Sequence, residues 1–274
     1  MLSGKKIGFL GGGNMAEALI RGLLCSKLVD AKSIIVSDVS EARLRCFRES
    51  YSLRTLEQNV DLVAHCDILI LAVKPQTMRD VLREVKGSVR SDQTIISIAA
   101  GIPTAFITEE LGRRARVVRV MPNTPALVLE GASAIAPSPY ATPEDLETTR
   151  SIFSSVGKVV VVEEPLMDAV TGLSGSGPAY VFYAMEAMRE AGIELGLPFD
   201  VAHSLVVQTF LGAARMVMET GEDPRVLRQR VSSPGGTTLA GLKVLEEQEF
   251  PCILKRAIEA AARRSAELAP RPGP

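Results

Sequence analysis

Short apolar runs alternate with amphipathic stretches through the first 164 residues of the chain. Apolar runs bounded by Gly, Pro or polar residues are typical of strands that are covered on both faces, and the stretches between them carry helical spacing. The predicted strands are Ile7–Leu10, Ser33–Asp38, Asp67–Val73, Thr94–Ile98, Arg116–Met121, Gly131–Ala136 and Gly157–Val162. The predicted helices between them include Gln76–Lys86, Pro103–Leu111 and Pro143–Ser155. This alternation predicts an α/β fold built on an open parallel sheet.

The pattern changes at Glu163-Glu164-Pro165, beyond which helical periodicity replaces strand-like runs. The predicted helices there are Pro178–Leu197, Val201–Thr220, Leu239–Glu247 and Phe250–Leu268. We therefore expect one domain over residues 1–164 and an all-α domain over residues 165–274. Several helix faces carry more Ala, Met, Val and Leu than a few helices can bury in one small domain. The excess predicts a subunit interface, with a monomeric helical bundle as the alternative.

Charge and cysteine content narrow the function classes. The 274 residues include 31 Lys or Arg and 32 Asp or Glu, which gives a formal net charge of -1. This balance gives no reason to expect nucleic acid or a membrane surface as a partner, and no apolar run approaches the length of a membrane span. Four scattered cysteines without a C-x-x-C pair predict reduced, mostly packed thiols and no metal site. The apolar stretch at the N-terminus is too short for a signal peptide, so a cytoplasmic location is expected.

A glycine-rich turn follows the first predicted strand. Gly11, Gly13 and Ala16 match the G-x-G-x-x-G/A fingerprint of dinucleotide-binding turns. Gly11 suits unusual backbone dihedral angles, Gly13 lets the backbone approach a pyrophosphate, and Ala16 lets the helix lie close to its strand. The N–H groups at the helix start can then bind the phosphates. For this motif alone, a glycine turn that binds nothing is the alternative.

Asp38 ends the second predicted strand, near the position where dinucleotide-binding folds place the acid that binds the adenosine ribose. A carboxylate there accepts a hydrogen bond from the 2′-hydroxyl and favours NAD. Ser37 and Arg43 lie close enough in sequence to bind a 2′-phosphate instead, so the choice between NAD and NADP stays open. The alternative role for Asp38 is the N-cap of a helix that starts near Glu41.

Small, Pro or polar residues follow four of the predicted strands. They are Gly11, Lys74-Pro75, Ala99–Gly101 and Pro122–Pro125. In an open parallel sheet the ligand lies beyond the carboxyl ends of the strands. We therefore expect these segments to meet at one binding edge.

Two further motifs lie in the second half. Gly172–Pro178 opens the first long helix, and its small residues suit close contact with a ligand or with a neighbouring helix. Ser232–Thr238 combines two glycines with two hydroxyls just before the helix that starts at Leu239. Free N–H groups, hydroxyl donors and the helix dipole suit a small carboxylate there. An ordinary helix cap by Thr237 or Thr238 is the alternative.

Side chains for acid–base or nucleophilic catalysis are scarce. His65 and His203 are isolated and are interpreted as packed or surface residues. No nucleophile–base pair and no metal-ligand spacing stands out. A cofactor that supplies the chemistry suits such a chain, since hydride transfer needs positioning more than a strong acid or base.

Together these motifs resemble those of pyrroline-5-carboxylate reductases, in the family's order along nearly the whole chain. They are Gly-Gly-Gly-Asn-Met-Ala at 11–16, Ala-Val-Lys-Pro at 72–75, Ala-Ala-Gly at 99–101, Met-Pro-Asn-Thr-Pro at 121–125, Gly-Leu-Ser-Gly-Ser-Gly-Pro-Ala-Tyr at 172–180 and Ser-Pro-Gly-Gly-Thr-Thr at 233–238. The resemblance implies an N-terminal Rossmann-type dinucleotide-binding domain and a C-terminal all-α dimerisation domain. It also implies interlocked dimers, often assembled into decamers, that share each active site between two subunits.

The resemblance further implies roles for individual residues. The implied cofactor-binding residues are Gly11, Gly12, Gly13, Asn14, Met15, Ser37, Asp38, Asn59, Ala72, Val73, Lys74, Pro75, Ala99, Ala100, Gly101 and Asn123. The implied substrate-binding residues, which would hold the substrate carboxylate, are Ser233, Gly235, Gly236, Thr237 and Thr238. Thr238 is the catalytic candidate, because its hydroxyl would lie near the ring nitrogen. The implied reaction passes hydride from NADPH or NADH to the C=N bond of 1-pyrroline-5-carboxylate and gives L-proline.

Two other functions fit part of the pattern. β-Hydroxyacid dehydrogenases also join a Rossmann domain to a helical one and resemble Gly172-x-x-Gly175-x-Gly177. They continue with a Lys and an Asn where this chain has Val181 and Met185. A protein that binds a dinucleotide without catalysis has the same fold, although an intact carboxylate cradle argues against it.

Overall fold

The computed structural model describes residue 2 and residues 4–269, and it divides into two compact units. The first unit comprises the residues up to Ser176 together with those from Glu259 onward. The second unit comprises Gly177–Ile258. The chain therefore leaves the first unit once and returns to it near its end.

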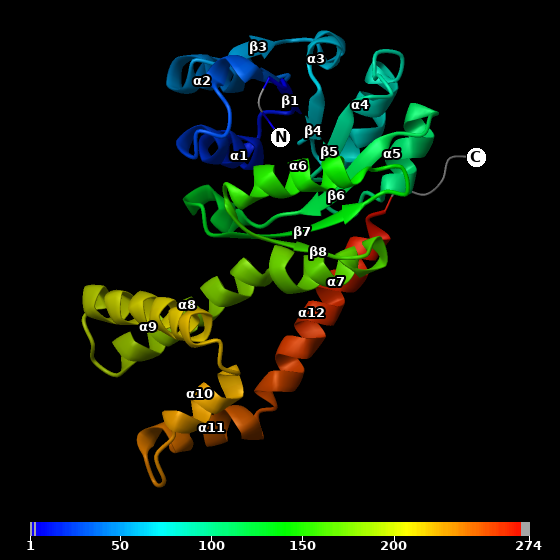
Figure 1. The fold of residues 1–274 in the computed structure, drawn as a ribbon. Coiled ribbons are helices and arrows are strands. Elements are labelled where there is room, and N and C mark those ends of the chain that lie inside the picture. Colours follow the sequence, from blue (N-terminus) through cyan, green and yellow to red (C-terminus); the bar gives the residue numbers. More distant parts are fainter. Residues whose placement is uncertain (1, 3, 270–274) are drawn as a thin grey trace. The chain divides into compact units, whose positions relative to one another are not determined.

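An eight-stranded sheet forms the centre of the first unit, in the order β3-β2-β1-β4-β5-β6-β7-β8 (Figure 1). Its strands are β1 (Ile7–Leu10), β2 (Ile34–Ser37), β3 (Arg54–Leu56), β4 (Ile68–Leu71), β5 (Thr94–Ser97), β6 (Arg116–Met121), β7 (Gly131–Pro137) and β8 (Gly157–Val161). All neighbours pair in parallel except β6 and β7, which are antiparallel. Only the short 3-10 turn η3 (Thr124–Val128) connects those two strands, and a parallel pair needs a longer crossover.

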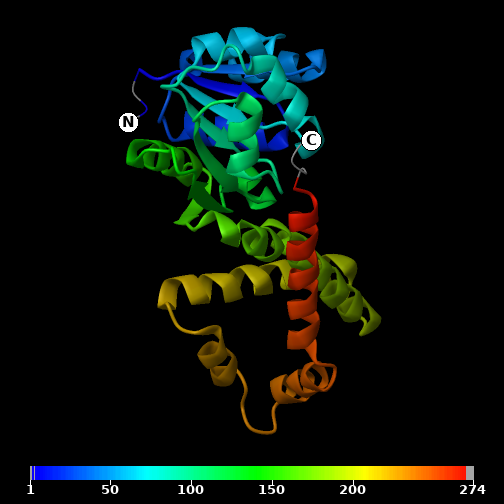
Figure 2. The same cartoon turned by 90° about the vertical axis from the view of Figure 1, so that its right-hand side faces the viewer.

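Helices cover both faces of this sheet (Figures 1 and 2). One core contains apolar side chains of α1 (Asn14–Cys25), α2 (Glu41–Tyr51) and α6 (Pro143–Ser154), and the other contains those of α3 (Asn59–His65), α4 (Met78–Val85) and α5 (Thr104–Leu111). Along β1 the side chains alternate between faces, with Ile7 and Phe9 in the first core and Leu10 in the second. Burial on both faces explains why these strands are almost continuously apolar.

A buried ion pair holds α6 against the sheet. Asp145 is fully buried and accepts hydrogen bonds from Arg116 on β6 at 2.6 and 2.9 Å. It also accepts bonds from the Thr94 hydroxyl and from the Thr142 N–H, with which it forms a capping box. Burial raises the pKa of Asp145, but the hydrogen bonds from Arg116, Thr94 and Thr142 outweigh it and hold the pKa below its ordinary value.

A second polar network joins the end of the chain to the sheet. Arg119 on β6 is nearly buried, and its guanidinium lies 3.7 Å from Glu164 and 3.6 Å from Asp168. Asp168 belongs to α7 (Met167–Val170) and accepts a 2.7 Å hydrogen bond from Ser265 of α12 (Phe250–Glu267). These contacts group α7 and the last part of α12 with the sheet. The compact units therefore differ in extent from the predicted domains of residues 1–164 and 165–274.

The second unit is entirely helical. It holds α8 (Gly177–Glu194), α9 (Phe199–Thr220), α10 (Pro224–Arg230), α11 (Thr237–Glu247) and the first part of α12, which Figure 2 shows as one unbroken helix ending in red. The buried apolar side chains of this unit are Ala202, Val206 and Leu227. Phe182, Leu205 and Met218 are among many large apolar side chains that stay exposed, at 60%, 56% and 66%. The predicted excess of apolar surface in this half is confirmed.

Helix α9 is long and apolar enough to cross a membrane, by length and composition only. The expectation that no apolar stretch approaches this length is therefore wrong for α9. Core helices of soluble proteins can have the same length and composition, so one such helix among residues 4–269 is weak evidence for a membrane span.

The cysteines are less packed than the sequence suggested. All four are free, but Cys25 and Cys252 are exposed and Cys46 is partly so. Only Cys66 is buried, and burial raises the pKa of its thiol to about 12. The prediction of reduced thiols agrees with the structure, and the prediction that most are packed is wrong.

Candidate active site

The glycine turn after β1 requires glycine at its first position. Gly11 has a φ of +98° and donates its N–H to the Ser37 carbonyl at 2.8 Å, which joins the ends of β1 and β2. A Cβ at Gly11 would lie 2.8 Å from the carbonyl oxygen of Ala72, the residue that follows the other neighbouring strand, β4. A side chain here is excluded both by the left-handed backbone and by space.

The same turn leaves room where a pyrophosphate would bind. A Cβ added at Gly13 would meet no atom within 4 Å. Gly13 is also the N-cap of the twelve-residue helix α1, and no side chain caps that end. The first N–H groups of Asn14, Met15 and Ala16 lack helical acceptors. This cradle fits the diphosphate of a dinucleotide.

Asp38 lies directly after β2 and contacts the glycine turn. Its Oδ2 accepts the Gly12 N–H at 2.7 Å, and its Oδ1 accepts the Ser40 N–H at 2.8 Å. The N-cap of α2 is Ser40, so the alternative interpretation of Asp38 as that N-cap is wrong. The carboxylate is instead fixed between the turn and the start of α2.

Arg43 is the cation that reaches this turn from α2. Its Nε donates to the Gly12 carbonyl at 2.6 Å, its Nη2 donates to Glu17 at 2.7 Å, and its guanidinium lies 5.2 Å from the Phe47 ring centre. Burial raises the pKa of Glu17, but hydrogen bonds from Arg43 and Tyr51 outweigh it, so the pKa of that carboxyl is lowered. Arg43 is therefore already paired with an ionised carboxylate.

Ser37 and Asn59 form a second pair at the end of β2. The buried Ser37 hydroxyl donates to Asn59 Oδ1 at 2.7 Å, and Asn59 Nδ2 donates to Glu84 at 2.8 Å. Asn59 is the first residue of α3, and Glu84 belongs to α4. Glu84 was not among the predicted site residues, because no local pattern links it to Asn59.

The loops after β4 and β5 line the next part of the same edge. Ala72 N–H bonds to the Leu10 carbonyl at 2.8 Å, and Lys74-Pro75 leads into the 3-10 turn η2 (Pro75–Thr77). Gly101, after Ala99 and Ala100, has a φ of +73°. A Cβ at Gly101 would lie 3.0 Å from Leu268 Cβ, beyond the last turn of α12. The predicted residues of the glycine turn, Val73 and these loops all lie at the carboxyl ends of adjacent strands.

Asn123, after β6, uses its amide for structure. Its Nδ2 donates to the Ser174 carbonyl at 3.0 Å, and its Oδ1 accepts the Ala132 N–H at 2.8 Å. Ser174 lies in the π-helical turn η5 (Thr171–Gly175), and a Cβ at Gly175 would lie 2.4 Å from Met121 Cε. This part of the Gly172–Pro178 motif therefore packs against the end of β6.

The predicted carboxylate cradle belongs to the second unit. Gly235 has a φ of +70°, and the Gly236 N–H bonds to the Ser233 carbonyl at 3.0 Å, which makes a tight turn before α11. Gly236 is the N-cap of α11, and no side chain caps that helix. Thr237 and Thr238 are exposed in its first turn. The alternative in which one of these threonines caps the helix is therefore wrong.

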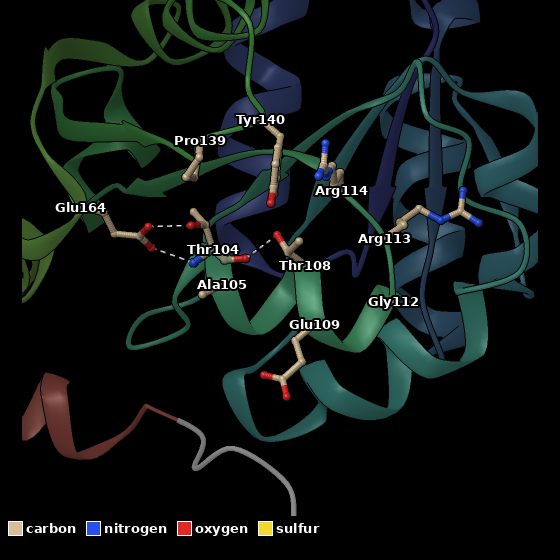
Figure 3. Close-up of a pocket in the computed structure, with 10 residues that line it drawn as sticks. All are labelled: Thr104, Ala105, Thr108, Glu109, Gly112, Arg113, Arg114, Pro139, Tyr140 and Glu164. Atoms are coloured by element: carbon tan, nitrogen blue, oxygen red, sulfur yellow. Dashed lines mark hydrogen bonds between the residues drawn. The ribbon is translucent and has the colours of Figure 1, made fainter.

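A cavity of about 630 Å³ lies along α5, lined in part by Thr104, Thr108 and Glu164 (Figure 3). Its polar groups are largely engaged with each other: Glu164 accepts from the Thr104 N–H and hydroxyl, and the Arg114 guanidinium lies 5.7 Å from the Tyr140 ring centre. None of the residues that line it was predicted to bind cofactor or substrate. The cavity therefore adds no residue to the predicted dinucleotide site at the fingerprint turn.

Comparisons with known proteins agree with this geometry. Residues 164–268 match the family described as pyrroline-5-carboxylate reductase dimerisation, and residues 6–101 match that described as NADP oxidoreductase coenzyme F420-dependent. A pyrroline-5-carboxylate reductase of Methanosarcina acetivorans is 46% identical over 97% of this chain and 99% of its own length. The solved structure of one from Coxiella burnetii has a TM-score of 0.91 and 38% identity, covering 97% of this chain and 99% of that one. A pyrroline carboxylate reductase structure from Plasmodium falciparum, with NADP bound, has a TM-score of 0.88 and 32% identity, covering 97% and 98%.

Proposed function

The chain belongs to the pyrroline-5-carboxylate reductase family, and on this premise we propose that it reduces the C=N bond of 1-pyrroline-5-carboxylate to L-proline, the last step of proline biosynthesis. It is an NAD(P)-dependent oxidoreductase, and the relative from Plasmodium falciparum was solved with NADP bound. The bound cofactor supplies the hydride. The alternatives of a β-hydroxyacid dehydrogenase and of a protein without catalysis have no comparable support along the whole chain.

We propose that the first half of the chain holds the cofactor through the carboxyl edge of its sheet. The glycine turn and the N-terminus of α1 would bind the diphosphate, and Asp38, Ser37 and Asn59 would face the adenosine ribose. The loops at 72–75 and 99–101, with Asn123, would line the nicotinamide. The observation that supports this most directly is the open, uncapped helix start at Gly13.

The second half would position the substrate. Residues 233–238 form a tight glycine turn at an uncapped helix start, whose N–H groups and dipole suit a carboxylate. Thr238 lies in the first turn of α11, and we propose that its hydroxyl hydrogen-bonds to the ring nitrogen. The side chain would then orient the C=N bond and stabilise the change in charge at nitrogen during reduction.

Replacement of Thr238 tests this assignment. Thr238→Ala should lower kcat about ten- to a hundredfold, the cost of one hydrogen bond to a charged group, while the dissociation constant of the reduced dinucleotide stays within about twofold. Thr238→Ser keeps the hydroxyl and should restore most of the turnover. Equal kinetics for wild type and Thr238→Ala, measured by the loss of absorbance of the reduced cofactor, would remove Thr238 from the site.

We also propose a functional division at residues 164 and 165, a homodimer that assembles further into a decamer, and a cytoplasmic location. The dimerisation family matched over residues 164–268 and the exposed apolar helices support self-association. A second copy of the chain, rather than a membrane, would cover α9. The formal net charge of -1 supports the absence of a nucleic-acid partner.

A further inference from the structure

The corner between β1 and β2 carries a fixed negative charge. Asp38 follows the last residue of β2, and β1 and β2 pair in register with Leu10 opposite Ser37. In dinucleotide-binding folds the adenosine ribose lies at this corner. An acid here accepts a hydrogen bond from the 2′-hydroxyl of NAD, whereas a basic residue is needed to accommodate the 2′-phosphate of NADP.

The Asp38 carboxylate cannot turn away without losing two hydrogen bonds. The Gly12 N–H holds one oxygen at 2.7 Å and the Ser40 N–H holds the other at 2.8 Å. Both donors are backbone groups, so they hold the carboxylate in place. Each oxygen retains acceptor capacity for a ribose hydroxyl, whereas a phosphate beside it would add like charge.

The cation that reaches this corner from α2 is already paired with a carboxylate. Arg43 donates to the Gly12 carbonyl and to Glu17, and it stacks on Phe47. A 2′-phosphate would have to compete with the partly buried Glu17 carboxylate for the same guanidinium. On the other side of Ser37, Asn59 donates to the carboxylate of Glu84. A ribose bound at this corner would therefore meet hydrogen-bond acceptors and a cation that is already paired with a carboxylate.

From this geometry we infer that Asp38 determines cofactor choice and that the enzyme prefers NADH to NADPH. The inference rests on the proposed dinucleotide site, and it sets this chain apart from the relative that was solved with NADP bound. Asp38 selects through hydrogen bonding to the 2′-hydroxyl and through repulsion of a 2′-phosphate. Arg43 acts as a positioning residue that braces the Gly12 carbonyl.

Direct binding measurements test the preference without catalysis. The fluorescence of each reduced dinucleotide, titrated with the wild-type protein in the absence of substrate, should give a dissociation constant for NADH about tenfold or more below that for NADPH. Added salt should bring the two dissociation constants closer together, because it screens the repulsion between the Asp38 carboxylate and the 2′-phosphate. Equal or tighter binding of NADPH by the wild type would overturn the inference, whatever any variant does.

Two substitutions separate charge from shape. Asp38→Asn removes the charge at nearly constant size, and Asp38→Ser removes both the charge and the bulk. In both variants the dissociation constants of NADPH and NADH should differ by no more than about threefold. The change should come mainly from tighter binding of NADPH. Glu41→Gln, an exposed acid at the start of α2 paired with Arg48, is the matched control and should leave the ratio of the two dissociation constants unchanged. A ratio that stays at the wild-type value in both Asp38 variants would show that another group sets the preference.

The reaction and the cofactor preference are tested by separate measurements. A protein that binds NADH tightly but does not oxidise it with 1-pyrroline-5-carboxylate would refute the proposed function and leave the cofactor inference standing. A protein that turns over equally well with both cofactors and binds both equally would refute the cofactor inference alone.

Discussion

Asp145 is a buried charged side chain away from the predicted site. It is fully buried and is satisfied by Arg116, Thr94 and Thr142. Removing one partner of such a pair leaves a desolvated charge without compensation, which costs far more than losing a surface ion pair. The ion pair and the capping box also depend on the same carboxylate.

Asp145→Asn should therefore lower the free energy of unfolding by about 3 kcal/mol at pH 7, measured by urea denaturation. Because the pKa of Asp145 is lowered in the folded state, its stabilising effect is complete above the unfolded pKa and is lost as pH falls through the folded value. The difference in the free energy of unfolding between wild type and variant should stay constant from pH 7 to 5 and shrink below about pH 4. Glu147→Gln, an exposed acid on the same helix, should change stability by less than about 0.5 kcal/mol. A constant difference down to pH 3 would contradict the assignment.

Sequence patterns identify site residues better than they identify the partners of those residues. The spacing of Gly11, Gly13 and Asp38 indicated a dinucleotide turn, and the structure gives each a geometry suited to it. That Arg43 is paired with Glu17 could not be predicted, because the contact joins residues far apart in sequence.

At the scale of elements, the apolar pattern located the seven longer strands to within one or two residues. It missed β3, since Arg54–Leu56 is only three residues long and lies at the edge of the sheet. It also missed the π-helical turn at Thr171–Gly175, whose hydrogen bonding leaves no periodic signature. Pro103 is the N-cap of α5, which begins at Thr104, rather than its first residue. Local boundaries of this kind depend on capping contacts that periodicity does not encode.

Close contact between α1 and the segment before β8 depends on one glycine. A Cβ at Gly22 would lie 2.4 Å from Val156 Cγ1 and 2.8 Å from the Ser155 carbonyl oxygen. Gly22→Ala should therefore lower the melting temperature, with a loss of about 1–3 kcal/mol despite the better helix propensity of alanine. Gly87→Ala is the control, because an added Cβ there meets no atom within 4 Å and the backbone has no positive φ. A Gly22→Ala protein as stable as the wild type would show that α1 can shift away from this contact.

At the scale of the whole molecule, the main feature is the amount of apolar surface that the helical unit leaves exposed. Monomeric proteins rarely expose large apolar patches, and helices α8 and α9 together carry exposed Phe, Tyr, Leu, Val and Met side chains. The apolar residues on the faces of the predicted helices had indicated this excess. The sequence pattern placed the domain change at residue 165, and the contacts of Arg119 join Glu164 and Asp168, on either side of that point, to β6. Those contacts join residues that are distant along the chain, so the local sequence pattern does not reveal them.

If a second copy covers this surface, a charge on α9 should break the assembly. Leu205→Glu should lower the mass measured by size exclusion with light scattering at micromolar concentration, because burying a carboxylate in an apolar interface costs several kcal/mol. Leu28→Glu replaces an exposed leucine outside the matched dimerisation region and should leave the mass unchanged. A wild-type chain that elutes as a clean monomer would remove the proposal of self-association.

The return of α12 to the sheet affects how the protein folds during synthesis. Residues from Glu259 onward complete the unit that begins at the N-terminus, through Ser265 against Asp168 and Leu268 against Gly101. Domains usually fold in order as they leave the ribosome. Here the last contacts of the first unit form only after the helical unit has been translated, so a nascent chain arrested before residue 259 would lack the contacts of Ser265 and Leu268.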